Sequence, residues 1–248
     1  VLTAPRSLMS DYRGCQTLGF AGNFPANLAP NLVWNLIFTL KSDKEGRMKY
    51  APYGLAKVEA SLLEYGFPRE DVIIADPTKL DRVIGERTRI VGISVLDPLG
   101  LSYASTLAKL VTTYMGFNPA EPYSARCFSE VINHPSIGRY RPKIVVGGPG
   151  VWQLEGKMEE LGITCLVEGE AEGVVGPLFE KLLRGEQVPR IIVGKPVEPE
   201  KLPIVRTPVR GGIVEITRGC GRGCKFCTPT LLKFRSIPKD IILKEVMV

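Results

Sequence analysis

Apolar residues recur along this chain with two spacings, which predict alternating strands and helices. Short continuous apolar runs predict strands that are buried on both faces of a sheet, at 1–4, 71–75, 89–94, 143–146 and 163–167. Apolar residues at every third or fourth position predict helices, at 52–64, 80–84, 102–115, 121–134, 152–161 and 172–183. This alternation predicts an α/β fold, a doubly wound, Rossmann-like parallel sheet covered by helices on both faces.

Three stretches depart from this alternation. Residues 5–49 form an irregular insert rich in Gly, Pro, Asn and Ser, with one short helix expected at 31–40. Residues 194–210 are rich in Pro and Lys, so we expect a linker there between two domains. The first domain is expected at 1–193, and residues 211–248 are expected to be the incomplete start of the second. The chain opens without Met and stops inside a helix expected at 238–248, so we expect a truncated piece of a longer protein.

Composition narrows the class of protein. The 248 residues are 44% hydrophobic and 23% charged, as in ordinary globular proteins. The net charge of +6 looks mild and scattered, and no aromatics interleave with the basic residues at 139–143, so we expect no nucleic-acid partner. The chain has neither a signal peptide nor an apolar run that could span a membrane, so we expect a cytoplasmic protein without a membrane partner.

The candidate chemistry lies in three cysteines near the end of the chain. Cys220, Cys224 and Cys227 have the spacing C-x3-C-x2-C and follow an apolar run at 211–216 that predicts a buried strand. Three thiolates form a soft ligand set, which suits an iron–sulfur cluster or zinc. Zinc would need a fourth ligand, and the one histidine, His134, lies far away in an Asn-His-Pro turn. The cluster is therefore favoured over zinc.

With Phe226 directly before the last cysteine, this motif resembles the signature of the radical S-adenosylmethionine (SAM) enzymes. The resemblance implies the first βα unit of a (β/α) barrel, in which the three cysteines hold three irons of a [4Fe–4S] cluster. The amino and carboxylate groups of SAM would chelate the fourth iron, with Phe226 near the adenine. A donor such as a ferredoxin or flavodoxin would supply the electron that cleaves SAM to a 5′-deoxyadenosyl radical.

A doubly wound domain just before such a loop resembles the cobalamin-binding domain of the cobalamin-dependent radical SAM enzymes, over roughly residues 1–183. Its markers are a Pro-Tyr-Gly-Leu helix start at 52–55, a Ser-x-Leu turn at 94–96, a double glycine at 147–148 and a Glu-Gly-Glu turn at 168–170. Ligands of such sheets bind beyond the carboxyl ends of the strands. The residues that we expect to contact cobalamin are Ser94, Leu96, Asp97, Gly100, Gly147, Gly148, Gly150, Val151, Glu168 and Gly169.

This chain differs from the wider family of cobalamin-binding domains at the residue that ligates cobalt. The motif Asp-x-His-x-x-Gly, whose histidine ligates cobalt, is absent. His134 precedes the strand expected at 143–146 and is expected at the opposite edge of the sheet from the ligand. We therefore expect no histidine of this chain to ligate cobalt, and the lower cobalt face to be open or approached by a side chain of residues 5–14.

The resemblance implies a class B radical SAM methyltransferase that uses a [4Fe–4S] cluster, SAM and cobalamin. Such enzymes transfer a methyl group to an unactivated carbon of a protein residue or a small molecule, and the residues leave the substrate open. One alternative is the cobalamin-binding module of a radical SAM enzyme that does not methylate, or a corrin sensor. Another is a degenerate domain that binds no cofactor and only packs on its neighbour.

Overall fold

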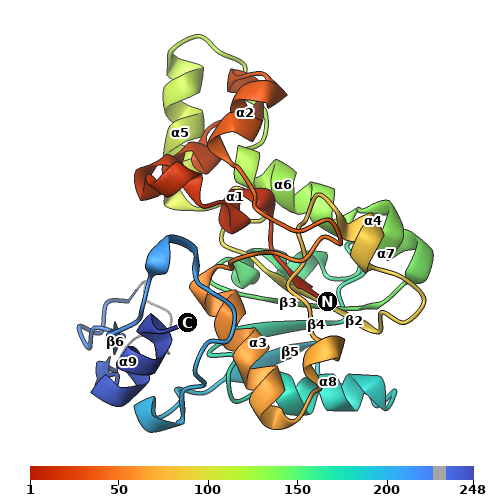
Figure 1. Cartoon of the computed structure of the whole chain (residues 1–248). Helices are drawn as coiled ribbons and strands as arrows, with labels where there is room; N and C mark the ends of the chain where they lie inside the picture. The colour runs from red at the N-terminus through yellow and green to blue at the C-terminus, as the bar shows by residue number, and fades with distance from the viewer. Residues whose placement is uncertain (226–232) are drawn as a thin grey trace.

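The computed structural model describes residues 1–225 and 233–248 and confirms an α/β fold with a parallel sheet (Figure 1). Within the described residues, five parallel strands form one sheet in the order β1-β2-β3-β4-β5. The strands are β1 (Leu2–Thr3), β2 (Ile90–Ser94), β3 (Lys143–Gly147), β4 (Cys165–Gly169) and β5 (Ile191–Gly194).

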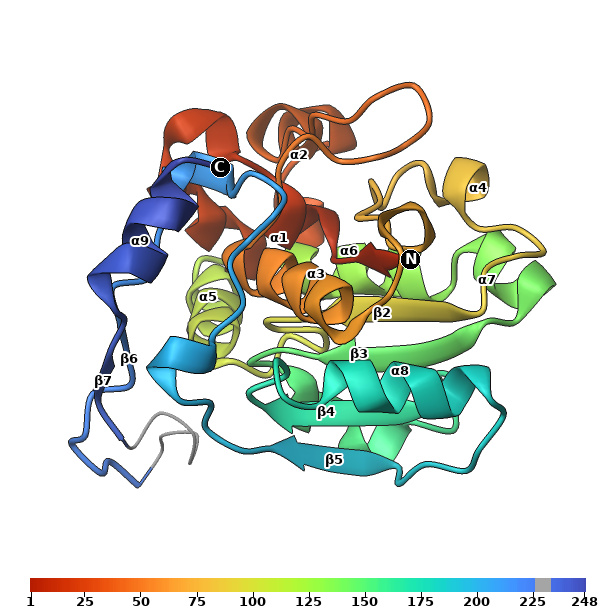
Figure 2. The same ribbon diagram turned by 60° about the horizontal axis from the view of Figure 1, so that its bottom comes forward.

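Helices cover both faces of this sheet (Figures 1 and 2). One face packs against α3 (Tyr53–Tyr65) and α8 (Val175–Leu183). The other packs against α4 (Leu80–Val83), α6 (Tyr123–Ile132), α7 (Pro135–Tyr140) and a 3-10 helix (Val151–Lys157). Successive residues of β3 divide between the two layers, because Val145 joins the first and Val146 the second. Burial on both faces explains why the strands are continuous apolar runs.

The two edges of the sheet differ from the sequence prediction. Beyond β1, the strand predicted at 71–75 makes only isolated bridges, Ile74 with Leu2 and Ala75 with Arg47. With this segment counted as the second strand, the order along the sheet is compatible with a doubly wound, Rossmann-like fold. At the other edge, β5 is a strand that the sequence analysis missed. Its side chains are half-buried or exposed except at Gly194, as expected where only one neighbour is present.

The strand predicted at 211–216 is not formed, and that prediction is wrong. Gly211 and Gly212 have φ values of 68° and 61°, a left-handed conformation that interrupts an extended chain. Ile213 and Ile216 are 44% and 62% exposed, so the run is not buried either. Instead, β6 (Thr217–Arg218) pairs with β7 (Arg235–Ser236) as an antiparallel hairpin apart from the main sheet (Figure 2). The helix predicted at 152–161 is likewise a shorter 3-10 helix.

The insert at 5–49 is ordered by aromatic packing. It contains α1 (Arg6–Met9), several 3-10 turns and α2 (Asn31–Ile37), and with α5 (Tyr103–Tyr114) it forms an upper lobe (Figure 1). The Trp34 and Phe38 rings stack on Tyr123 of α6, with centroids 4.5 and 4.9 Å apart. These contacts anchor the lobe to the sheet layer. None of the helices in the described parts of the chain combines the length and apolarity needed to cross a bilayer.

A buried ion pair fastens the end of the chain to the first helix layer. Lys57 of α3 lies 2.6 Å from the Glu245 carboxylate of α9 (Lys239–Val246), and both side chains are 2% exposed or less. The Tyr53 hydroxyl and the Val205 backbone N–H also donate to Glu245. Lys57 donates in addition to the carbonyl of Pro203. The hydrogen bonds offset the cost of removing this ion pair from water. Removing one partner would leave the other charge buried without a counter-ion.

Replacing Lys57 by Met leaves Glu245 buried without its counter-ion, so we expect the free energy of unfolding to fall by about 3–5 kcal/mol. Urea denaturation followed by circular dichroism measures this change. The double variant Lys57→Met/Glu245→Leu removes both charges and recovers most of the loss. The exposed pair Lys157–Glu160 provides the control, because Lys157→Met costs less than about 1 kcal/mol. A Lys57→Met effect as small as that of the control contradicts this prediction.

Candidate functional site at the carboxyl edge of the sheet

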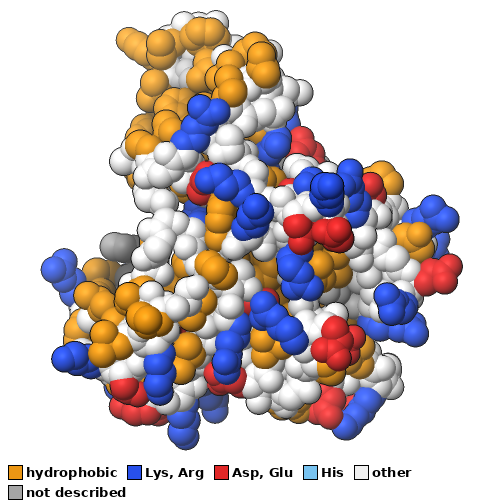
Figure 3. Space-filling view, in the orientation of Figure 1, with side chains coloured by type: hydrophobic (Ala, Val, Ile, Leu, Met, Phe, Trp, Pro, Cys, Tyr) orange, Lys and Arg blue, Asp and Glu red, His pale blue; other side chains and the backbone are white. Residues whose placement is uncertain are grey.

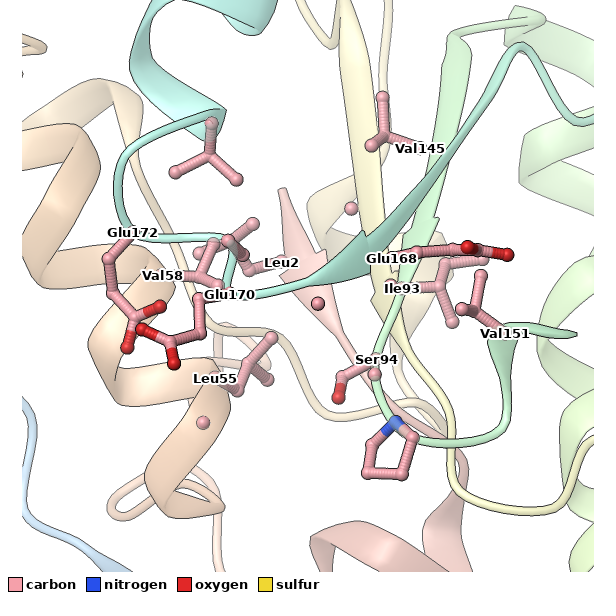
Figure 4. A pocket seen from close by; sticks show the side chains of 18 of the residues that line it. Leu2, Leu55, Val58, Ile93, Ser94, Val145, Val151, Glu168, Glu170 and Glu172 are labelled. Atoms are coloured by element: carbon pink, nitrogen blue, oxygen red, sulfur yellow. The ribbon is translucent and has the colours of Figure 1, made fainter. Parts of the chain in front are cut away.

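A cavity of about 670 Å³ opens at the carboxyl edge of the sheet (Figure 4). Its floor is apolar and is built by side chains of the sheet and of α3 and α8, including Leu2, Leu55, Val58, Val145 and Phe179. Its rim is built by Ser94 at the end of β2 and by the turns that follow β3 and β4. Both the position and the size are typical of a small-molecule site in a parallel α/β fold.

The cavity brings together six of the residues predicted to contact cobalamin: Ser94, Gly147, Gly148, Val151, Glu168 and Gly169. Four others, Leu96, Asp97, Gly100 and Gly150, do not line it. Phe226 lies outside the described residues. The sequence analysis did not predict as contacts the lining residues Leu55, Val58, Trp152, Glu170, Glu172, Val175, Phe179, Glu215 and Arg218. Glu170 stood in the turn already singled out at 168–170, and Glu172 follows two residues later. The apolar residues of α3 and α8 could not be recognised, because nothing in a helical apolar stripe distinguishes a cavity wall from a core.

Asp97 has a structural part in this edge. It is 5% exposed and accepts hydrogen bonds from the Ser102 backbone N–H and hydroxyl, the Ser105 hydroxyl and the Gln153 amide. Burial acts to raise the pKa of Asp97, but the hydrogen bonds from Ser105, Gln153 and Ser102 outweigh it and lower that pKa below its ordinary value. The carboxylate thus joins the turn after β2 to the start of α5 and to the 3-10 helix after β3.

The glycines after β3 are required by close backbone packing. Gly148 has a φ of 106°, and a Cβ built there would lie 2.5 Å from the carbonyl oxygen of Val95. A Cβ on Gly150 would lie 2.2 Å from the carbonyl oxygen of Leu96. The turn after β3 therefore packs directly on the turn after β2. A side chain at 148 or 150 would push these two turns apart, whether or not a ligand is present.

A buried carboxylate holds the hairpin of β6 and β7 against this edge. Arg218 and Arg235 are directly opposite each other in the hairpin, where like charges repel. Glu170, from the turn after β4, lies between them and accepts hydrogen bonds from both guanidinium groups, at 3.2 Å from Arg218 and 3.0 Å from Arg235. It also accepts from the Val197 backbone N–H at 2.8 Å. Glu170 therefore reduces the repulsion between the two arginines and docks the hairpin on the sheet.

Arg218 extends this network into the cavity wall. It contacts Glu172 at 2.7 Å and Glu215 at 2.7 Å, and Arg218, Glu172 and Glu215 all line the cavity. Burial acts to lower the pKa of Arg218, but the hydrogen bond and charge of Glu215 and the charge of Glu172 raise it above its ordinary value. Arg218 is therefore a fixed cation at the mouth of the cavity, two residues before Cys220.

Two polar groups on the rim have no partner of their own. Neither the Ser94 hydroxyl nor the Glu168 carboxylate makes a hydrogen bond or ion pair with another residue of the described chain. Glu168 lies on the side of Ile93 and Val151, whereas Glu170 and Glu172 lie together on the side of α3 (Figure 4). These two unpaired groups are available to a ligand, since an unsatisfied polar group in a cavity wall gains from a bound partner.

The structure describes only part of the predicted metal site. Cys220 is exposed and Cys224 is half-buried, and both are free thiols, whereas Cys227 lies outside the described residues. Among residues 1–225 and 233–248, no three His, Cys, Asp or Glu side chains gather in a way that could hold a metal ion. The triad therefore stays a prediction. Burial raises the pKa of Cys127 and of Cys165 to about 11, which makes these two thiols unreactive.

His134 lies away from the cavity, among residues between α6 and α7. Its Nδ1 accepts a hydrogen bond from the Ser136 backbone N–H and caps α7, which leads to the amino end of β3. His134 does not line the cavity. This placement agrees with the expectation that His134 lies at the edge of the sheet opposite the candidate site.

Comparison with known proteins finds no match to the chain among protein-family models, curated proteins or solved structures. A function therefore has to be argued from the residues of this chain and their geometry.

The network around Glu170 predicts a specific loss of stability in acid. Burial acts to raise the pKa of Glu170, but the hydrogen bonds from Arg235 and Val197 and the charges of both arginines lower it below its ordinary value. The contribution of ionised Glu170 to the free energy of unfolding is therefore fully present above the pKa of about 4.3 that a glutamate has in the unfolded chain. It is lost as the pH falls through the lower pKa of Glu170 in the folded protein.

Replacing Glu170 by Gln removes this contribution, and we expect the free energy of unfolding at pH 7 to fall by about 3 kcal/mol. The difference from wild type shrinks as the pH is lowered from about 5 to about 3, because wild-type Glu170 itself becomes protonated. Urea midpoints measured across this pH range test it, with Glu160→Gln as the exposed control. A difference that stays constant down to pH 3 contradicts the network as described.

Proposed function

We propose that this protein is a cobalamin-dependent radical SAM enzyme that transfers a methyl group to an unactivated carbon. In this proposal Cys220, Cys224 and Cys227 hold a [4Fe–4S] cluster that binds SAM, and the carboxyl edge of the sheet binds cobalamin. When bound, the cluster and SAM would supply a radical that abstracts hydrogen, and cobalamin would supply the methyl group.

One observation carries the proposal: the segment directly before the cysteines contributes two residues to the cavity wall. Glu215 and Arg218 line the cavity, and Cys220 follows two residues later. A ligand seated at the carboxyl edge would therefore lie beside the cysteine loop, as a reaction that uses both groups requires. The buried contacts of Glu170 hold the two parts together without any ligand.

The lining of the cavity fits a large, mostly neutral ligand. Its floor is apolar, and the glycine turns expose backbone on the rim. Ser94 can donate a hydrogen bond and Glu168 can accept one, which suits the amide and hydroxyl groups of a corrin. A cavity of about 670 Å³ is large enough for one arm of such a molecule.

The cysteine loop has the access that a cluster needs. Cys220 is exposed, and Cys224 is half-buried close to it in sequence. The thiolate ligands suit iron–sulfur chemistry. In this proposal the part of Arg218 is to hold the start of the loop, since its guanidinium is fixed by carboxylates on both sides.

The triple variant Cys220→Ala/Cys224→Ala/Cys227→Ala tests the cluster. We expect anaerobic reconstitution of the wild-type chain to give the broad visible absorption of a [4Fe–4S] cluster, and the variant to lose that absorption with its iron and sulfide. The variant Cys15→Ala, which removes an exposed cysteine elsewhere, keeps the cluster. Iron and sulfide near wild-type levels in the triple variant overturn the assignment.

A tryptophan placed in the cavity tests the cobalamin site. Val58 of α3 is half-buried and lines the cavity, so Val58→Trp fills the space that a ligand would occupy. We expect its affinity for cob(II)alamin, measured by absorption titration, to fall at least tenfold, which corresponds to about 1.4 kcal/mol. Leu63→Trp, a similar half-buried change on the same helix outside the cavity, leaves the affinity unchanged.

Equal affinities in wild type and in the folded Val58→Trp variant place the ligand elsewhere. No binding by wild type removes cobalamin from the proposal and leaves the degenerate domain as the explanation. If both cofactors bind, analysis of products for a transferred methyl group separates a methyltransferase from a module or sensor that does not methylate.

A further inference from the structure

One helix of the upper lobe turns its apolar face toward solvent. The buried residues of α5 are small or carry a hydroxyl group: Ser105, Ala108 and Thr112. The large apolar residues of the same helix are all exposed: Tyr103, Leu107, Leu110, Val111 and Tyr114. With 3.6 residues per turn, these two sets lie on opposite faces of the helix. A surface helix of a globular protein has the reverse arrangement, so among the described residues α5 has no neighbour that buries its apolar face.

Polar contacts hold the inner face of α5 where it lies. The Ser105 hydroxyl donates to the Asp97 carboxylate at 2.5 Å, and the Ser105 backbone N–H donates to the Ser102 hydroxyl that caps the helix. The Thr112 hydroxyl donates to the carbonyl of Ala108. Turning the helix to bury its apolar face would break the contact with Asp97, so the outward orientation of the apolar residues is fixed.

The chain around this face carries almost no charge. Residues 14–40 contain no Asp, Glu, Lys or Arg, and residues 98–120 contain only Lys109, although 23% of the whole chain is charged. Both segments contribute to the upper lobe, and hydrophobic side chains cover much of its visible face (Figure 3). The large apolar side chains at 103–117 present on the order of 800 Å² to water, which is about what one partner contributes to a stable interface.

The spacing of the exposed residues indicates the kind of partner. Four of them follow at intervals of four, three and four residues, the spacing with which one helix packs along another: Tyr103, Leu107, Leu110 and Tyr114. This seam, Tyr-x3-Leu-x2-Leu-x3-Tyr, reads the same in both directions. Between two antiparallel copies, each Tyr103 would lie opposite Tyr114 and each Leu107 opposite Leu110. The seam is therefore complementary to itself under a twofold rotation.

A lipid surface fits this face less well than a second copy does. Helices that lie on membranes combine an apolar face with several Lys and Arg residues that contact lipid headgroups. The helix α5 has one such residue, Lys109, and the uncharged segment at 14–40 supplies none. An interface between identical copies brings like charges together unless the surface is uncharged, and this surface meets that condition.

We propose that α5 packs antiparallel on α5 of a second copy of this chain, in a twofold dimer. The two leucines of each seam form the centre of the interface, and the two tyrosines cover its ends. The residues of α5 do not line the cavity at the carboxyl edge of the sheet, so the dimer leaves both cavities open. The inference does not depend on the cofactors proposed above.

Sedimentation equilibrium of the wild-type chain from about 1 to about 100 μM tests the dimer. A thiol reductant is present, because Cys15 is exposed and could form a disulfide between copies. We expect a reversible, concentration-dependent approach to the mass of two chains. Leu107→Glu/Leu110→Glu places carboxylates in the seam and raises the dissociation constant at least tenfold. Leu183→Glu/Leu243→Glu, a matched change of two exposed leucines on α8 and α9, leaves the dissociation constant unchanged.

Two variants of the tyrosines test the antiparallel direction. In Tyr103→Lys/Tyr114→Glu, each introduced lysine would face an introduced glutamate of the second copy, so the dimer is retained. In Tyr103→Lys/Tyr114→Lys, like charges would meet at both ends of the seam, so we expect a dissociation constant at least tenfold higher than for the first variant. Tyr103 and Tyr114 are 83% and 93% exposed, so both variants fold, which circular dichroism verifies.

Each part of the proposal can be overturned separately. A wild-type chain that stays monomeric at about 100 μM refutes the dimer. A dimer that Leu107→Glu/Leu110→Glu leaves intact refutes the role of α5, and equal dissociation constants for the two tyrosine variants refute the antiparallel seam. If monomeric wild type instead co-sediments with neutral phosphatidylcholine vesicles and the leucine variant does not, the face is a lipid surface and this inference is wrong.

Discussion

The arrangement of the candidate site depends on one buried carboxylate between two arginines. Arg218 and Arg235 lie opposite each other in a two-stranded hairpin, which alone has little apolar surface to bury and brings like charges together. Glu170 comes from the turn after β4 and bonds to both guanidinium groups. The hairpin therefore acquires its position only where it meets the sheet, and the turn after β4 serves both the cavity and the cysteine segment.

The same edge of the sheet is shaped by contacts between strand-end turns. Gly148 and Gly150 allow the turn after β3 to touch the backbone after β2, and Asp97 joins that turn to α5. These contacts fix the turns of the rim, and apolar side chains of α3, α8 and the sheet line the cavity beside them. A pre-formed hollow with a fixed rim and two unpaired polar groups is the arrangement that favours a specific ligand over general packing.

The hairpin faces two ways, and its charges are divided accordingly. Toward the sheet, its two arginines form buried ion pairs with glutamates. Arg222, Lys225, Lys233 and Lys239, which lie close to the two hairpin strands in sequence, are exposed.

The sequence by itself determined the α/β class and part of the rim of the candidate site. Strands covered on both faces have to be continuous apolar runs, so 89–94, 143–146 and 163–167 were recognisable, and the turns after them were marked by glycine, serine and glutamate. The spacing of the cysteines likewise belongs to the sequence alone. The run at 211–216 was misjudged because the same apolar pattern is compatible with a strand until two left-handed glycines and an already occupied sheet edge exclude it.

Only the tertiary structure decided which residues share the site. The cavity floor consists of apolar residues of the sheet, α3 and α8 that local pattern cannot distinguish from core, because the difference lies in what packs opposite each side chain. The roles of Glu170, Glu172 and Arg218 depend on contacts across 48 residues or a similar separation. Such contacts depend on how the layers pack, because a buried charge is stable only next to its counter-ion. No local sequence pattern shows which distant residues will be neighbours.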